Sequence, residues 1–110
     1  MAKRGQLTDK IKAISKKSLG YEINQTQLRL MPYIQYTLVD TQKIDRRKID
    51  EEETQILLEW EREGRIMIND TIITTTKDFW NAICEILYYG YVAYENEQYI
   101  SDTRNYNPPK

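Results

Sequence analysis

The chain contains no histidine, and this absence removes several kinds of site at once. Catalytic triads with a histidine base, histidine-ligated metals and histidine pH switches are all excluded. The single cysteine, Cys84, cannot form a disulfide within the chain, and a zinc site needs several cysteine or histidine ligands. Because Cys84 falls in the apolar pattern of a helix, we expect it to be a buried thiol.

Long apolar runs and phosphate-binding loops are also missing. No stretch approaches the roughly 20 apolar residues that span a bilayer, and no apolar segment follows the basic N-terminus, so we expect neither a membrane span nor a secretory signal. The patterns GxxxxGKS/T and GxGxxG do not occur, and neither do the inward Glu-x-x-His motifs of a di-metal site. We therefore expect no enzyme, no catalytic residue, no cofactor, no metal and no membrane partner.

What is present suits one soluble domain. A chain of 110 residues has a common domain size. We predict a single globular helical domain over residues 1–95 and a loosely ordered C-terminal tail over 96–110, where the periodic pattern stops. The net charge is −1, but residues 1–30 hold seven basic and two acidic residues, and residues 31–64 hold five basic and nine acidic. A basic head on an acidic body favours specific contacts with partners.

The most informative stretch is residues 50–94, and its first part predicts a capped helix followed by a hairpin. Asp50 and Glu53 have the spacing of a capping box, and Gly64 is a natural end for the helix between them. Beta-branched residues on both sides of Asn69-Asp70 predict a hairpin near residues 65–75, with its two-residue turn at that pair.

A last helix follows the hairpin. Thr75 or Thr76 is its expected N-cap, and apolar residues then repeat at spacings of three and four over about four turns, as far as Tyr94. Gly90 interrupts this pattern, and it marks either a close helix crossing or an early end of the helix.

The N-terminal half predicts two more helices. One runs from Thr8 to Leu19 and ends at Gly20. Asn24 could cap a second over 25–40, but Pro32 inside it would cost roughly 3 kcal/mol. We therefore expect a short turn, a break near Leu30 and a helix from Pro32 to about Val39. The predicted fold is mainly α: a compact bundle of about four helices with one short β-hairpin near 65–75, compatible with a winged helix.

A winged helix places its recognition helix just before the hairpin, so residues 50–63 can be tested for that role. They carry six glutamates and one arginine, a charge that repels phosphates. DNA binding would have to use other residues, namely Lys10, Lys12, Lys16, Lys17, Arg46 and Arg47. A winged-helix-like DNA-binding regulator with a basic N-terminal helix is therefore the alternative function.

Tyrosine is abundant, with nine residues, six of them in the last quarter of the chain. Tyr88 and Tyr89 cannot both face the core together with Tyr91, so at least one should be exposed. Exposed aromatic side chains are common anchors of protein interfaces. We therefore predict a non-enzymatic interaction protein that docks to a protein partner or self-associates, through Tyr88, Tyr89 and the acidic face at Glu59 and Glu63.

Three segments carry a resemblance to known proteins: LMPYIQYTLVDTQKID, EEETQILLEWEREGRI and TTTKDFWNAICEILYYGYV. In style and order they resemble small accessory proteins of tailed bacteriophages and enterobacterial prophages, over most of residues 1–95. The resemblance implies a place in the cytoplasm of a bacterial host and a regulatory or host-interaction role, with a host protein as one candidate partner. It assigns no functional residues.

Overall fold

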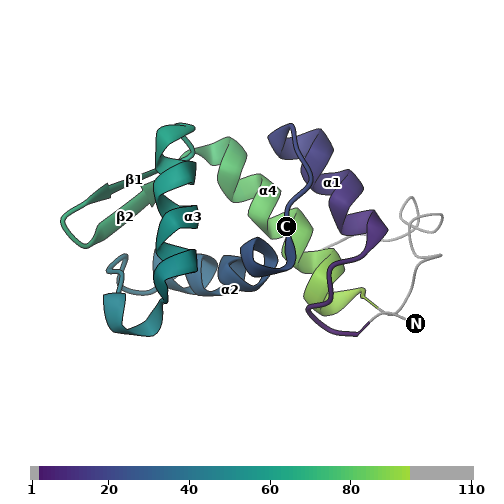
Figure 1. Cartoon of the computed structure of the whole chain (residues 1–110), viewed down its shortest axis with the longest axis horizontal. Helices are drawn as coiled ribbons and strands as arrows, with labels where there is room; N and C mark the ends of the chain where they lie inside the picture. Colours follow the sequence, from purple (N-terminus) through teal and green to yellow (C-terminus); the bar gives the residue numbers. More distant parts are fainter. Residues whose placement is uncertain (1–2, 95–110) are drawn as a thin grey trace.

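The structure is a computed structural model, and it describes residues 3–94. The C-terminal tail predicted at 96–110 lies outside the described residues. The elements, in chain order, are α1 (Asp9–Leu19), α2 (Gln25–Val39), the short 3₁₀ helix η1 (Arg46–Lys48), α3 (Glu51–Arg62), β1 (Ile66–Asn69), β2 (Ile72–Thr75), α4 (Lys77–Leu87) and the π-helical turn η2 (Tyr88–Val92). The hairpin projects at one end of the molecule and α1 lies at the other, with α4 running between them (Figure 1). The predicted fold class, mainly α with a short hairpin, is confirmed.

Local chemistry sets most helix ends as predicted. The Thr8 side chain accepts a hydrogen bond from the Ile11 N–H, and Gly20 closes α1 with φ +93°, a left-handed conformation that favours glycine. Asp50 and Glu53 form a complete capping box at α3, with side-chain to backbone distances of 2.8 and 2.9 Å.

The prediction of a break before Pro32 is wrong. Helix α2 runs unbroken from Gln25 to Val39 with Pro32 inside it, and Asn24 caps it through a capping box with Gln27. Buried residues lie on both sides of the proline: Leu28, Leu30, Met31, Ile34 and Thr37. Packing of both halves against the core therefore outweighs the hydrogen bond that Pro32 cannot donate.

The hairpin forms as predicted, but its turn lies one residue later. Asn69 pairs with Ile72, so the two turn residues are Asp70 and Thr71, and Asp70 has a φ of +62°. Residues 42–44 extend the other edge of β2: the Ile73 N–H donates to the Gln42 oxygen, and the Ile44 N–H donates to the Thr71 oxygen, both at 2.8 Å. These contacts fix the link between α2 and α3 to the hairpin.

The last helix changes character at Leu87, where the prediction continued an α-helix to Tyr94. Residues Tyr88–Val92 form a π-helical turn. Gly90 lies in this turn where it crosses α1, because a Cβ atom added there would be 3.2 Å from the Ile11 Cδ1. A close crossing is thus the role of Gly90, one of the two predicted alternatives.

The core lies where the helices meet, and it is built mainly from isoleucine and leucine around two aromatic rings. Trp60 of α3 and Phe79 of α4 are almost fully buried and meet edge to face, with ring centroids 5.1 Å apart. The Trp60 indole donates to the Tyr21 hydroxyl at 3.0 Å. None of the helices among residues 3–94 has the length and apolar character needed to cross a membrane.

The order of α3 and the hairpin is that of a winged helix, but the element before α3 differs. A helix-turn-helix needs a helix joined to the recognition helix by a turn of three or four residues. Here that place is taken by η1, which has only three residues. The described part of the chain therefore has the wing-like hairpin without a full helix-turn-helix.

Candidate functional site

A pocket of about 350 Å³ opens between α2 and the end of α4. We call it the α2–η2 pocket, and its lining is Arg4, Pro32, Gln35, Cys84, Leu87, Tyr88, Tyr91 and Val92. Most of these groups are apolar or aromatic, and one is a cation. Pockets of this size and composition are common binding sites for small ligands or for the side chains of a partner.

The N-terminal segment, residues 3–7, brings Arg4 to the wall of this pocket. The Gly5 N–H donates to the Gly90 oxygen at 2.8 Å, and the Gln25 amide bonds both the Gly5 oxygen and the Leu7 N–H. Gly5 has φ +78°, and an added Cβ would lie 3.0 Å from the Tyr91 ring. These contacts hold Arg4 near the Tyr91 ring, with its Cζ 5.8 Å from the ring centroid.

Large exposed side chains continue from the pocket along α2. Pro32, Gln35, Tyr36 and Val39 share one face of α2, because they are spaced at i, i+3, i+4 and i+7. Tyr36, Val39 and Val92 are 63%, 66% and 66% exposed, values that are high for residues of this size. We call the α2–η2 pocket together with Tyr36 and Val39 the docking surface.

The four residues predicted for a protein interface fall into two groups. Tyr88 lines the α2–η2 pocket, and the Tyr89 ring packs edge to face on it with the centroids 5.1 Å apart. Both rings are half-buried and engaged with neighbours. Glu59 and Glu63 lie on α3 and at its C-cap, and both are exposed.

The two groups do not meet. The Tyr89 ring contacts Lys10 at the start of α1, while Glu63 accepts from the Tyr21 hydroxyl just beyond the end of α1. Most of α1, which has 11 residues and a length of about 16 Å, lies between these two points. Glu63 also takes part in the fold, because the Arg65 Nε lies 2.5 Å from its carboxylate.

The six basic residues of the DNA-binding alternative are also dispersed. The Lys10 Nζ lies 3.5 Å from the centroid of the Tyr89 ring, and burial lowers its pKa, an effect that Glu85 partly offsets. Arg47 forms a two-point pair with Asp45. Lys12, Lys16 and Lys17 follow α1, whereas Arg46 and Arg47 lie on η1, in the link between α2 and α3 at the other end of the molecule (Figure 1). No continuous basic face unites them within residues 3–94.

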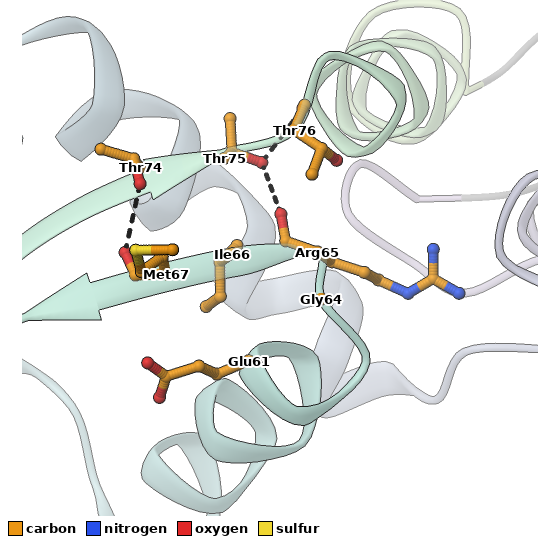
Figure 2. A pocket seen from close by; sticks show the side chains of 8 residues that line it. All are labelled: Glu61, Gly64, Arg65, Ile66, Met67, Thr74, Thr75 and Thr76. Carbon is orange, nitrogen blue, oxygen red and sulfur yellow. Dashed lines mark hydrogen bonds between the residues drawn. The ribbon is translucent and has the colours of Figure 1, made fainter.

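A second pocket, of about 390 Å³, lies at the base of the hairpin (Figure 2). Its polar groups are used by the fold: Glu61 accepts from the Ile68 N–H, and the Thr75 hydroxyl donates to the Arg65 oxygen. Figure 2 shows the Arg65 side chain pointing away from Glu61, and its guanidinium bonds the Leu19 oxygen. Met67 is the one lining residue with a large exposed apolar side chain. This pocket offers a partner less than the docking surface does.

Metal chemistry has no visible basis in this part of the chain. Residues 3–94 contain no group of three or more cysteine, aspartate or glutamate side chains placed to hold an ion. Cys84, predicted to be buried, is half-exposed in the α2–η2 pocket, where the Gln35 amide lies 3.6 Å from its sulfur.

The prediction found Tyr88 but missed Arg4, Pro32, Tyr36, Val39 and Val92. One signal was available: the inward stripe of α2 contains Leu28, Met31 and Ile34, which leaves Tyr36 and Val39 on the outward face. Arg4 reaches the pocket through contacts with Gly90 and Gln25 that are distant in sequence, so no local pattern marks it.

Comparisons with protein-family models, with curated proteins and with solved structures find no match for this chain.

Proposed function

We propose that this protein is a non-enzymatic interaction protein and that it binds a protein partner through the docking surface. One observation carries the proposal: Val92, about two-thirds exposed, lines an aromatic-lined pocket, and the α2 face that supplies Pro32 and Gln35 to this pocket continues in Tyr36 and Val39, which are exposed to a similar degree. Contiguous apolar patches with a pocket are typical of protein interfaces, whereas isolated exposed apolar residues are ordinary.

The arrangement supplies both an anchor site and a rim. An apolar or aromatic side chain of the partner enters the pocket beside Tyr88, and Tyr36 and Val39 cover the adjacent segment of the partner. Well-packed central pockets provide most of the binding energy of such interfaces. Origin from a phage or prophage, a cytoplasmic setting and a bacterial host protein as the partner stay predictions, since no relative was found that tests them.

Capture from a bacterial lysate tests the proposal when it is done with matched variants. The full chain is compared with Val39→Glu/Val92→Glu, which places charge on the docking surface, and with Lys16→Gln/Lys17→Gln, which changes the basic face of α1. We expect a protein that is retained after nuclease treatment, lost with the first variant and kept with the second. Circular dichroism verifies that both variants are folded.

The alternative has a different signature. DNA binding would disappear with nuclease and with the lysine variant, and it would weaken by orders of magnitude between about 50 and 200 mM salt. Self-association would shift the mass measured by light scattering with protein concentration, and Val39→Glu/Val92→Glu would abolish that shift. Capture that is indifferent to Val39→Glu/Val92→Glu would contradict the proposed surface.

A further inference from the structure

We propose that residues 95–102 of this chain, ENEQYISD, dock in cis on the α2–η2 pocket and compete there with the protein partner. The competition rests on the proposed function, but the docking itself does not. Three observations carry the inference: the charge at the pocket, the composition of residues 95–102, and the point at which they join the described chain.

The pocket combines apolar walls with positive charge. Arg4 is the only charged residue among its eight lining residues. Arg29, one helical turn before Pro32 on α2, is exposed. Burial raises the pKa of the Tyr91 phenol, and both Arg4 and Arg29 partly offset this rise, so both cations act on the Tyr91 side of the pocket. An occupant that matches these features has an apolar anchor next to carboxylates.

Residues 95–102 have that composition. They contain Glu95, Glu97 and Asp102 and no basic residue, and Tyr99-Ile100 lies among the three acids. We call these eight residues the acidic segment. The rest of the chain after it contains Arg104 and Lys110, so the negative charge is concentrated next to the described part.

The attachment point makes docking in cis geometrically simple. Val92 lines the pocket, and the acidic segment begins three residues later. From Tyr94 to Tyr99 the backbone spans at most about 17 Å, which is ample for a pocket that starts at Val92. A short tether of this kind gives an effective concentration in the millimolar range, so even weak intrinsic affinity fills the pocket.

Cys84 is a built-in reporter, because it is the only cysteine of the chain and it lines the pocket. The rate of its modification by a thiol reagent is measured in the full-length protein, in Tyr99→Ala/Ile100→Ala, and in Glu95→Gln/Glu97→Gln. Tyr106→Ala, beyond the acidic segment, is the matched control. If the effective concentration is about ten times the dissociation constant, removal of the anchor should speed modification by about tenfold. The charge variant should speed it less, and Tyr106→Ala should leave the rate unchanged.

A peptide supplies the reverse test. Acetylated ENEQYISD amide in excess should slow the modification of Tyr99→Ala/Ile100→Ala toward the rate of the unmodified chain, and a scrambled peptide should not. Equal rates in the unmodified chain and in Tyr99→Ala/Ile100→Ala, with unchanged circular dichroism, would overturn the inference. Protection that grows with protein concentration would also overturn it, because the occupant would then be a second copy.

Failure of this inference is distinguishable from failure of the proposed function. If Tyr99→Ala/Ile100→Ala speeds Cys84 modification and also increases partner capture, both hold. Faster modification without any capture that depends on Val92 leaves the docking in cis and removes the partner site. Capture that depends on Val92, together with unchanged modification rates, removes only the docking in cis.

Discussion

The crossing of α1 and η2 at Gly90 yields a quantitative prediction about coupling. A Cβ atom at position 90 would lie 3.2 Å from the Ile11 Cδ1 and 3.7 Å from the Leu28 Cδ1. The second distance is an ordinary van der Waals contact, so the conflict involves one methyl group. Ile11→Val removes that methyl group and leaves the rest of the side chain in place.

Each single variant lowers the free energy of unfolding by its own cost, and the double variant avoids part of both costs. Gly90→Ala adds volume at a tight contact, which costs typically about 1–3 kcal/mol, and gains up to about 1 kcal/mol of helix propensity. Ile11→Val costs about 0.5–1.5 kcal/mol as a deletion of a buried methyl group. In the double variant the added methyl occupies the space of the deleted one. The double variant should therefore be more stable than the sum of the single effects by about 0.5–3 kcal/mol.

Urea unfolding, followed by circular dichroism for the four proteins of this cycle, measures the coupling. Gly64→Ala combined with Ile11→Val is the control cycle, because a Cβ at Gly64 meets nothing within 4 Å. We expect additivity there within about 0.5 kcal/mol. Additivity to the same degree for Gly90→Ala and Ile11→Val would refute the close crossing.

Three further predictions follow from the same contacts. Tyr21→Phe leaves the buried Trp60 N–H without its acceptor and should cost about 1–3 kcal/mol in urea unfolding, whereas Tyr36→Phe at an exposed ring should change little. Burial and the hydrogen bond to Glu63 raise the pKa of Tyr21. The protonated phenol therefore stabilises the fold fully below the unfolded pKa near 10, and this stabilisation is lost as the pH rises through the folded pKa. The difference in free energy of unfolding between the unmodified chain and Tyr21→Phe should therefore shrink above pH 10. A difference that stays constant would contradict this. Pro32→Ala supplies the missing N–H in α2 and should raise the free energy of unfolding by about 1–3 kcal/mol, and a lower urea midpoint would count against a strained helix.

The sequence predicts those parts of the fold that local chemistry determines. The caps at Gly20, Asp50 and Thr76 act through residues three or four apart, and each lies where the pattern places it. The prediction is wrong at Pro32, where the helix is maintained by contacts from distant segments. After Leu87 the chain leaves the α-helical pattern where Gly90 meets segments that are distant in sequence: the Gly5 N–H donates to the Gly90 oxygen, and a Cβ at Gly90 would lie 3.2 Å from the Ile11 Cδ1.

The candidate site also combines a feature that local sequence predicts with features that depend on contacts between distant segments. Tyr88 stands out in the sequence because adjacent tyrosines cannot share one helix face. Glu59 and Glu63 are the predicted acidic part of the same interface, but the fold places Glu63 beside Tyr21, beyond the C-terminal end of α1, whereas Tyr89 contacts Lys10 at the start of α1. Which elements meet in space decides the composition of a surface, and the linear pattern does not contain that information.

Three departures from local preference lie at or beside the α2–η2 pocket. Pro32 interrupts the hydrogen bonding of α2, Gly5 adopts a left-handed backbone under the Tyr91 ring, and Gly90 lies in a π-helical turn. Pro32 lines the α2–η2 pocket. Gly5 directly follows Arg4, which also lines the pocket, and Gly90 lies between two further lining residues, Tyr88 and Val92. Residues that violate local rules tend to gather at functional sites, and π-helical turns are frequent there. The pocket at the hairpin base is lined by another left-handed residue, Gly64 with φ +79°, whereas the proline inside a helix and the π-helical turn both lie at the α2–η2 pocket, which is an independent reason to assign the docking surface to it.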